Sequence, residues 1–374
     1  MITKFVPLPA DDGGKQRAFA ILERLARRAR VTLCAFDDGS ADVAGVEDLG
    51  VEVRSVRWEP TVGRSLLGAF ATGSISAGRF WDRRLANVVR SAGDRELDLL
   101  QVEYLQMAPY ARGIKARRRV LDLHNIESEL TSSYGRIAGW PRRPVIMAEA
   151  VALRGLERRA CRDFDRVAVV SDRDRRRFAG HDGQVIVCPN GWDPGSVLPP
   201  AREPVVVFVA TMGWPPNADA AVWFTSEVWP LVRARLPSAR LMLVGRDPTS
   251  AVRNLGGPGV TVTGTVSDVA PFLAEARVAV APLRAGGGSR LKILEALDAG
   301  RPVVATAVGA EGLEDLRGEG VVVAEGREPL ARAVGDLLGD PDSAARLGQR
   351  GHEAVARRYD WDRTLRPLLD GIAT

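Results

Sequence analysis

The chain has 374 residues, 45% of them hydrophobic, and this length predicts two domains that each bury a core. No stretch of 18 apolar residues occurs, so the sequence predicts no transmembrane helix. Residues 1–10 lack the charged and apolar segments of a signal peptide and are expected to form a first strand.

The cysteines and histidines are few and scattered. Three cysteines without a CxxC pair argue against a disulfide framework, and the three histidines show no metal-ligand spacing. We therefore expect a reducing cytoplasmic location and no structural zinc site.

The net charge of +5 is concentrated in the N-terminal half. Residues 1–200 carry 32 basic and 26 acidic side chains (+6), whereas residues 201–374 carry 20 and 21 (−1). Two interpretations stay open: an arginine-rich proteome, since arginine outnumbers lysine 48 to 4, or contact with an anionic partner such as the inner face of a membrane. The basic runs have no interleaved aromatic residues, so no nucleic-acid partner is expected.

Short apolar runs alternate with helical patterns in the first half of the chain. This alternation predicts a parallel sheet covered on both faces, with strands at Val31–Phe36, Val51–Val56, Leu97–Tyr104, Val120–His124, Val167–Ser171 and Val185–Cys188. Residues 58–80 are rich in Gly, Ser and Ala and lack a strand period. We interpret them as a mobile helix-loop insertion, of the kind where acceptors bind.

Four prolines within residues 194–204 interrupt the pattern, which then restarts. Helices are expected at 217–235, 289–299 and 341–373, and further strands at Val205–Ala210, Leu241–Gly245, Val260–Thr263, Val278–Ala281, Val303–Ala307 and Val321–Ala324. The predicted fold class is α/β, with two doubly wound Rossmann-like domains that face each other across a cleft. Their predicted bounds are 1–195 and 204–355, and a C-terminal helix over 356–374 is expected to pack back on the first domain. In such folds ligands bind at the carboxyl ends of the strands.

The densest motif lies at residues 280–304, where a strand, three glycines and a helix follow one another. Gly286, Gly287 and Gly288 allow close approach of the backbone to a ligand, and Ser289 is a plausible N-cap. Arg290 and Lys292 fall in the first helical turn, where cations are unfavourable unless an anion offsets them. This arrangement predicts a diphosphate site.

Glu295 lies further along the same helix. It is interpreted as an acceptor for two ribose hydroxyls, and the alternative is an i,i+3 ion pair with Lys292.

These residues resemble a known family. Gly-Gly-Ser-Arg-Leu-Lys-Ile-Leu-Glu-Ala at 287–296, Gly-Arg-Pro-Val-Val at 300–304, Leu-Asp-Leu-His-Asn-Ile-Glu at 121–127 and Met-Gly-Trp-Pro-Pro-Asn at 212–217 are similar in order and spacing to the retaining glycosyltransferases of the GT-B fold, family 4. The resemblance spans the whole chain. It implies a transferase that moves a sugar from a nucleotide-diphosphate sugar to a hydroxyl acceptor, with retention and without a metal or other cofactor. The acceptor would be a lipid-linked sugar, an oligosaccharide or a natural product.

The resemblance also implies roles for individual residues. The C-terminal domain would be the donor side, where Glu295 holds the ribose and Arg290 and Lys292 neutralise the leaving diphosphate. The N-terminal domain would be the acceptor side, where His124 lies near the reaction centre. The remaining donor candidates are Gly13, Gly14, Gly287, Gly288, Ser289, Leu291, Asn190, Gly213 and Arg246, and the acceptor candidates are Asp11, Asp12 and His124.

Two positions depart from the family pattern. Gly287 occupies the place of a common glutamate, which leaves the donor sugar open. Residues 211–217 lack the usual arginine and lysine, so the diphosphate charge is expected to fall to Arg290 and Lys292. Trp214 is expected either to stack on a base or to pack, and Asn217 is most simply the N-cap of the next helix.

Three other functions were weighed against sugar transfer. A sugar-nucleotide epimerase of the same fold would need more acid and base groups than the sequence offers. A non-catalytic nucleotide-sugar-binding subunit is suggested only by Gly287. A nicotinamide dehydrogenase is disfavoured because no strand is followed by GxGxxG.

Overall fold

The structure is a computed structural model, and it describes residues 1–137, 140–181, 183–286 and 291–370. It divides into two compact units. The first comprises Met1–Pro189 together with the chain from Leu365 onward, and the second comprises Asn190–Thr364. None of the helices in the described ranges combines the length and the apolar character that crossing a bilayer requires.

The first unit is built on a seven-stranded parallel sheet in the order β3-β2-β1-β4-β5-β6-β7. Its strands are β1 (Ile2–Phe5), β2 (Thr32–Asp37), β3 (Glu52–Arg57), β4 (Leu97–Glu103), β5 (Ala116–Leu123), β6 (Arg166–Val169) and β7 (Val185–Val187). Its helices are α1 (Gly13–Ala26), α2 (Val43–Glu47), α3 (Val62–Thr72), α4 (Ile75–Arg79), α5 (Arg83–Ala92), η1 (Leu105–Ala111), α6 (Glu127–Ile137), α7 (Arg143–Asp163), α8 (Asp172–Arg175), η2 (Arg176–Phe178) and α17 (Arg366–Leu369). The strand order reverses between β1 and β4, which is where such sheets bind ligands.

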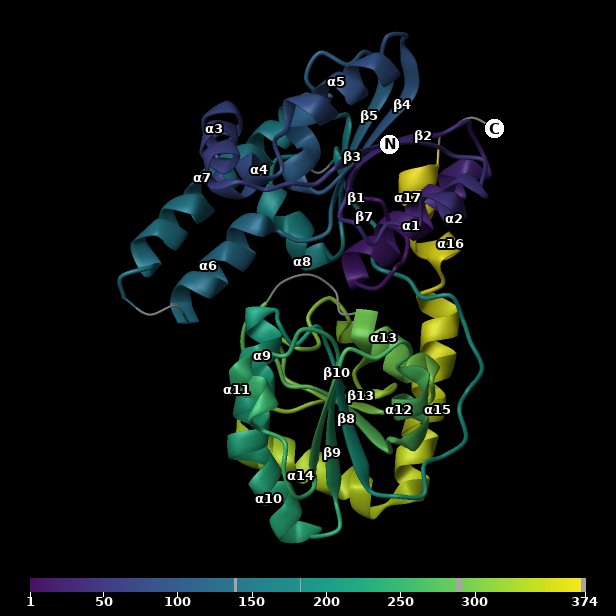
Figure 1. Ribbon diagram of the computed structural model, residues 1–374. Helices are drawn as coiled ribbons and strands as arrows, with labels where there is room; N and C mark the ends of the chain where they lie inside the picture. Colours follow the sequence, from purple (N-terminus) through teal and green to yellow (C-terminus); the bar gives the residue numbers. More distant parts are fainter. Residues whose placement is uncertain (138–139, 182, 287–290, 371–374) are drawn as a thin grey trace. The chain divides into compact units, whose positions relative to one another are not determined.

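The second unit repeats this plan with six parallel strands in the order β10-β9-β8-β11-β12-β13, and its order reverses between β8 and β11 (Figure 1). The strands are β8 (Val205–Val209), β9 (Arg240–Val244), β10 (Val260–Gly264), β11 (Val278–Ala281), β12 (Val303–Ala305) and β13 (Val321–Val323). The helices are α9 (Pro215–Trp223), η3 (Phe224–Val228), α10 (Trp229–Arg235), α11 (Ser250–Arg253), α12 (Ala270–Glu275), α13 (Leu291–Asp298), η4 (Glu314–Leu316), α14 (Arg327–Gly339), α15 (Pro341–Arg358) and α16 (Trp361–Thr364). The predicted α/β class with two doubly wound sheets is confirmed.

The helix expected over 217–235 begins two residues earlier and contains one π turn, η3. Pro230 lies two residues after this turn. A proline has no N–H to donate and its ring crowds the carbonyl four residues back, so an inserted residue relieves both problems. Asn217 is not the N-cap of this helix, as we had expected, because Pro215 and Pro216 start the helix earlier and Trp214 takes the cap position.

Residues 58–80 are more helical than the composition suggested, since they form α3 and α4. The two helices pack backbone against backbone at Gly68 and Gly78, where a Cβ on either residue would collide with the other helix. Small residues at this contact therefore allow an antiparallel helical pair.

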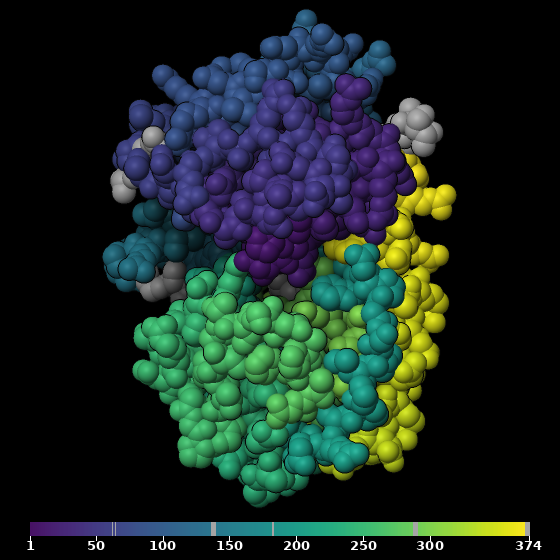
Figure 2. Space-filling model, turned by 45° about the vertical axis from the view of Figure 1, so that its right-hand side comes forward, coloured from purple at the N-terminus to yellow at the C-terminus, as the bar shows by residue number. Residues whose placement is uncertain are grey.

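The connection between the sheets lies along the surface of the second unit. Residues 194–204 run beside α15, as the teal chain beside the yellow helix shows (Figure 2). Asp298 anchors the start of this segment by accepting hydrogen bonds from Trp192 Nε1 and Gly195 N, each at 3.1 Å. After the second unit, the chain returns to the first unit from Leu365 onward. There Arg118 donates a hydrogen bond to the Asp370 carbonyl at 2.7 Å.

One buried ion pair ties α1 to the sheet of the first unit. Arg17 donates from Nε to Asp122 Oδ2 at 2.6 Å and from Nη2 to Asp122 Oδ1 at 2.8 Å, and both side chains are at most 1% exposed. A third nitrogen, Nη1, donates to the Pro189 carbonyl at 3.2 Å. The guanidinium thus joins the first helix, strand β5 and the last residue before the second unit.

We expect Asp122→Asn to lower the free energy of unfolding of the first unit by about 3–5 kcal/mol, because it leaves the Arg17 charge buried without its counter-charge. Chemical denaturation followed by circular dichroism measures this loss. The matched control is Asp98→Asn, which removes a surface pair with Arg117 in which Asp98 is 90% exposed, and which should change stability by less than about 1 kcal/mol. Equal effects of the two substitutions would contradict this account.

Candidate functional site

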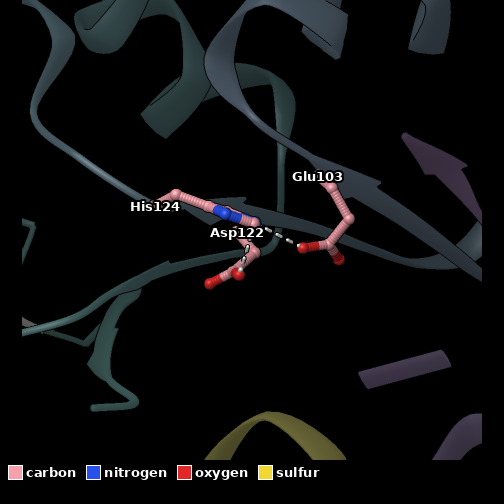
Figure 3. Close-up of side chains that lie close together, drawn as sticks. All are labelled: Glu103, Asp122 and His124. Carbon is pink, nitrogen blue, oxygen red and sulfur yellow. Dashed lines mark hydrogen bonds and ion pairs between the residues drawn. The ribbon is translucent and has the colours of Figure 1, made fainter. Parts of the chain in front are cut away.

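Four side chains meet at the carboxyl edge of the first sheet, beside the reversal of strand order. Glu103 ends β4 and Tyr104 follows it, while Asp122 lies near the end of β5 and His124 follows that strand. Figure 3 shows the carboxylates of Glu103 and Asp122 directed at the imidazole of His124. All three are buried.

The imidazole contacts both carboxylates through one nitrogen. His124 Nε2 lies 2.9 Å from Glu103 Oε2 and 3.4 Å from Asp122 Oδ2. Glu103 also accepts a hydrogen bond from Gln101 Nε2 at 2.7 Å, and Asp122 is held by Arg17. The ring of His124 stacks on Tyr104, with centroids 3.8 Å apart.

The charges in this cluster are set by burial and by Arg17. Burial lowers the pKa of His124 to about 3, so the imidazole is neutral near pH 7. Burial alone would raise the pKa of Asp122, but the charge and hydrogen bonds of Arg17 outweigh it and hold that pKa below its ordinary value. Burial, and then the negative charge of Asp122, hold the pKa of Glu103 well above the ordinary value.

These pKa directions indicate which groups of the cluster are charged. Since Arg17 already compensates Asp122, the raised pKa favours a neutral Glu103 carboxyl group, and the lowered pKa favours a neutral imidazole at His124. The cluster is therefore a polar lining rather than a strong base.

Tyr104 and the first turn of α1 complete this edge. Tyr104 adopts a left-handed φ of 70°, and the Lys4 ammonium lies 4.2 Å from the centroid of its ring. A Cβ at Gly14 would collide with the Tyr104 hydroxyl, so the glycine expected at the site permits this contact. Gly13 and Gly14 begin α1, and Asp12 caps the helix by accepting from Gly14 N and Lys15 N. Asp11 lies 3.4 Å from Lys15 Nζ.

Glu103, Asp122 and His124 also have the chemistry of a metal site, since one ligand atom of each lies within 4.8 Å of the others. The donor set fits a divalent cation poorly. Both oxygens of Asp122 already accept from Arg17, whose positive charge a cation at this position would have to face.

The second unit presents a different set at its own reversal of strand order, between β8 and β11. Lys292 Nζ donates to Asn217 Oδ1 at 2.9 Å, and Asn217 Nδ2 donates to the Thr211 carbonyl at 2.9 Å. The Lys292 ammonium also lies 5.2 Å from the centroid of the Phe208 ring. Asn217 therefore holds the lysine at the edge where β8 ends.

Glu295 lies one turn further along α13 and is half-buried. Burial, and then the charges of Asp268 and Asp298, raise its pKa to about 7. Within the described ranges Glu295 makes no ion pair, and Lys292 donates a hydrogen bond to Asn217. A carboxyl group of this kind gains from hydroxyl donors on a ligand.

The other candidates on this side are distributed as follows. Gly213 lies against the Asp247 backbone, where a Cβ would be 2.7 Å from the carbonyl oxygen. The Arg246 carbonyl accepts from Met212 N at 2.9 Å, and the Arg246 side chain is 31% exposed. Leu291 is buried at the start of α13, and Asn190 is buried at the start of the second unit. Gly287, Gly288, Ser289 and Arg290 lie outside the described residues.

Sequence reasoning missed Arg17, Glu103 and Asp122, and it gave Asn217 a different task. Asp122 had a local signal, because it lies two residues before His124 and side chains on a strand alternate with period two. Glu103 also had one, as the last residue of an apolar strand. Arg17 had none, since nothing in a helical segment marks one arginine for burial.

Two family models match the chain, one for each half. Residues 12–191 match the glycosyl transferase 4-like domain, and residues 203–340 match the glycosyl transferases of group 1. Together they span most of both units.

Curated relatives carry glycosyltransferase names. A GDP-mannose-dependent alpha-(1-6)-phosphatidylinositol monomannoside mannosyltransferase of Mycobacterium tuberculosis is 29% identical over 273 residues, which are 64% of this chain and 68% of the relative. A D-inositol 3-phosphate glycosyltransferase of Salinispora tropica is 44% identical over 84 residues, which are 21% of this chain and 17% of the relative.

Solved structures share the fold. A sucrose-phosphate synthase from Thermosynechococcus elongatus aligns with a TM-score of 0.72 at 20% identity and covers 98% of this chain and 96% of its own. HepE from Anabaena, solved in complex with UDP and glucose, aligns with a TM-score of 0.69 at 19% identity and covers 99% and 98%. With a doubly wound sheet in each unit and both family models matched in order, this chain belongs to the GT-B glycosyltransferases of family 4, group 1.

Proposed function

We propose that this enzyme transfers a sugar, with retention of anomeric configuration, from a nucleotide-diphosphate sugar to a hydroxyl group of a glycolipid. The observation that carries the donor half is on α13, where Lys292 and Glu295 follow the glycine-rich segment. One is a cation that donates a hydrogen bond to Asn217, and the other is a half-buried carboxyl group that lacks an ion pair among the described residues.

The donor side of this proposal uses the second unit. Lys292 neutralises the diphosphate, together with Arg290 and the backbone of residues 287–289. Glu295 accepts hydrogen bonds from the two ribose hydroxyls. Gly213, Arg246 and Asn190 lie around this donor and shape it without supplying the main charge.

The reacting centre and the acceptor belong to the first unit. His124 contacts the transferred sugar as a neutral hydrogen-bonding group, since its low pKa disfavours a charged imidazolium. The bond between the anomeric carbon and the diphosphate oxygen breaks, and the acceptor oxygen bonds to the same carbon on the same face. The acceptor proton passes to the departing phosphate oxygen, so the protein needs no strong base there.

We propose that transfer requires no metal ion. Positive charge for the leaving diphosphate comes from side chains and a helix end, and Arg17 already compensates the carboxylate that a metal at the His124 cluster would use.

The acceptor is assigned from the relatives. The mycobacterial mannosyltransferases are named for a phosphatidylinositol monomannoside acceptor, which favours a lipid-linked sugar over a free natural product. Their names also favour transfer over the epimerase and the non-catalytic subunit. We place the enzyme in the cytoplasm at the inner face of a membrane.

Titration calorimetry with GDP, UDP, dTDP and ADP tests the donor site. We expect one diphosphate to bind tightly and a chelator to leave its Kd unchanged within about twofold. A Kd that rises more than about tenfold with chelator would contradict metal independence, because that change corresponds to about 1.4 kcal/mol of binding lost with the ion.

The pKa of Glu295 gives a pH dependence with a definite sign. Ionised Glu295 accepts better than the neutral form, so nucleotide affinity should rise as pH increases through about 7. Glu295→Gln should weaken binding by about 1.5–3 kcal/mol and abolish this rise. The control is Glu275→Gln, a surface pair with Arg240, which should keep both the affinity and its pH profile. A parent enzyme with flat affinity between pH 6 and 8 would refute the ribose assignment.

His124→Ala should separate the two halves of the site. We expect kcat/KM for transfer to fall about tenfold to a hundredfold from lost hydrogen bonds to the sugar, while the Kd for free nucleotide stays within about twofold. His352→Ala is the matched control, since His352 bonds to the Asp298 carbonyl in the second unit, and it should leave kcat/KM near the parent value. A His124→Ala enzyme of parental activity would remove this residue from the mechanism.

A further inference from the structure

The first unit exposes an unusual number of large apolar side chains in two segments. Nine large hydrophobic residues are exposed in the described ranges, and eight of them come from residues 66–75 and 140–151. Phe70 is 90% exposed and Trp140 is 85% exposed, and the others are Leu66, Leu67, Ile75, Val145, Met147 and Val151. We call these eight residues the apolar face. Such a concentration marks an interaction surface rather than ordinary scatter.

Hydrogen bonds to the carboxylate of Glu149 join the two segments. Glu149 of α7 accepts from Ser74 Oγ at 2.5 Å, Ile75 N at 2.9 Å and Ser76 N at 2.9 Å, and so caps the start of α4. Because α3 packs on α4 through Gly68 and Gly78, all three helices are fixed as one body. Figure 1 shows α3 and α4 beside α7.

The segments that carry the apolar face are basic in sequence. Residues 60–81 contain two arginines and residues 130–148 contain three, and neither segment contains an aspartate or a glutamate. Of the carboxylates that border these segments, Glu59 and Asp82 pair with Arg84, and Glu129 pairs with Arg177. Glu149 accepts the hydrogen bonds that cap α4. A complementary partner is therefore apolar in part and anionic in part.

The combination of exposed apolar residues and arginines favours a bilayer over a second copy of the chain as the partner. A second copy of the chain would set arginines against arginines, which repel. A bilayer that contains anionic lipid offers both an apolar interior for Phe70 and Leu67 and phosphates for the exposed Arg79, Arg142 and Arg143 of the same segments. Arginine and tryptophan at one surface also suit the level of the headgroups.

The apolar face is connected to the edge that carries His124. Gln106, in the helix that follows Tyr104, donates to Ser76 Oγ of α4 at 3.4 Å. The Tyr110 hydroxyl donates to the Phe80 carbonyl at 2.6 Å and accepts from Asp82 N at 2.7 Å. The chain after β3 and the chain after β4 are thus bonded at the same carboxyl edge of the sheet.

We propose that the apolar face on α3, α4 and the start of α7 docks on an anionic lipid bilayer. The docked helices hold the His124 edge of the first unit close to the lipid surface. The docking proposal is argued from the exposed residues of the first unit alone. The further idea that docking presents a lipid-linked acceptor to the enzyme rests on the proposed transfer function.

Flotation of the full chain with vesicles tests the docking. The vesicles are phosphatidylcholine alone or phosphatidylcholine with phosphatidylglycerol. We expect partitioning at least about tenfold stronger onto the anionic vesicles, falling at high salt. Leu67→Ser with Phe70→Ser should reduce partitioning by at least about tenfold. Val197→Ser, at an exposed apolar residue of the second unit, is the matched control and should bind as the parent does.

A second readout comes from Trp140. Brominated lipid in the anionic vesicles should quench part of the tryptophan fluorescence of the parent, and Trp140→Phe should remove that part. Circular dichroism checks that each variant is folded. We expect it to be, because the substituted side chains are exposed and do not belong to the core.

Two outcomes would overturn the docking proposal. These are absence of binding to anionic vesicles by the parent and parental binding by the Leu67→Ser/Phe70→Ser variant. Nucleotide titration of the same samples keeps the two proposals apart. Vesicle binding without nucleotide binding refutes the transfer function alone, and nucleotide binding without vesicle binding refutes the docking alone.

Discussion

The first unit depends on the buried pair of Arg17 and Asp122. Two charges removed from water are tolerated only where each compensates the other, and here both carboxylate oxygens accept from the guanidinium. The pair fixes α1 on β5 and reaches the Pro189 carbonyl, so it sets the position of the Gly13–Gly14 turn relative to the strand that carries His124. Because Arg17 keeps Asp122 ionised, the neighbouring Glu103 is left to take up a proton.

The two carboxyl edges differ in how the charges of their side chains are arranged. The cluster around His124 is compensated internally, with one ion pair and two groups that burial drives toward their neutral forms. At the edge around Glu295, a half-buried carboxyl group has a raised pKa, and the neutral amide of Asn217 accepts a hydrogen bond from Lys292. A neutral lining suits a sugar, and a cation beside a hydrogen-bond acceptor suits a nucleotide diphosphate.

The helices that carry the apolar face need stabilising contacts from elsewhere. The exposed side chains of Phe70 and Leu67 bury little area on folding and so add little to the stability of the first unit. That support is the glycine contact between α3 and α4 and the Glu149 cap, both of which act at the backbone. Side chains are thereby left available for a partner without loss of order in the helices.

Periodicity determined much of the architecture. Apolar runs such as Val205–Val209 and Val278–Ala281 are buried in the middle of a sheet. Their positions follow from the sequence, because a strand that is covered on both faces consists almost entirely of apolar residues. The glycine-rich segment before α13 and the family motifs pointed to Lys292 and Glu295 for the same reason, since those signals are local. The N-cap expected at Asn217 failed because two adjacent prolines started the helix earlier, a competition between local signals.

Only the tertiary structure decided the partners. Arg17 and Asp122 are separated by 105 positions, and Lys292 and Asn217 by 75, and no local pattern links residues so far apart. The raised pKa of Glu295 arises first from burial, then from Asp268, which a distant segment brings near, and from Asp298 on the same helix. The sequence by itself determined which segments become strands and helices, because that choice depends on neighbours a few positions away. Which charges meet, and hence which groups are neutral, was decided by the packing of distant segments, because an electrostatic energy depends on distance in space.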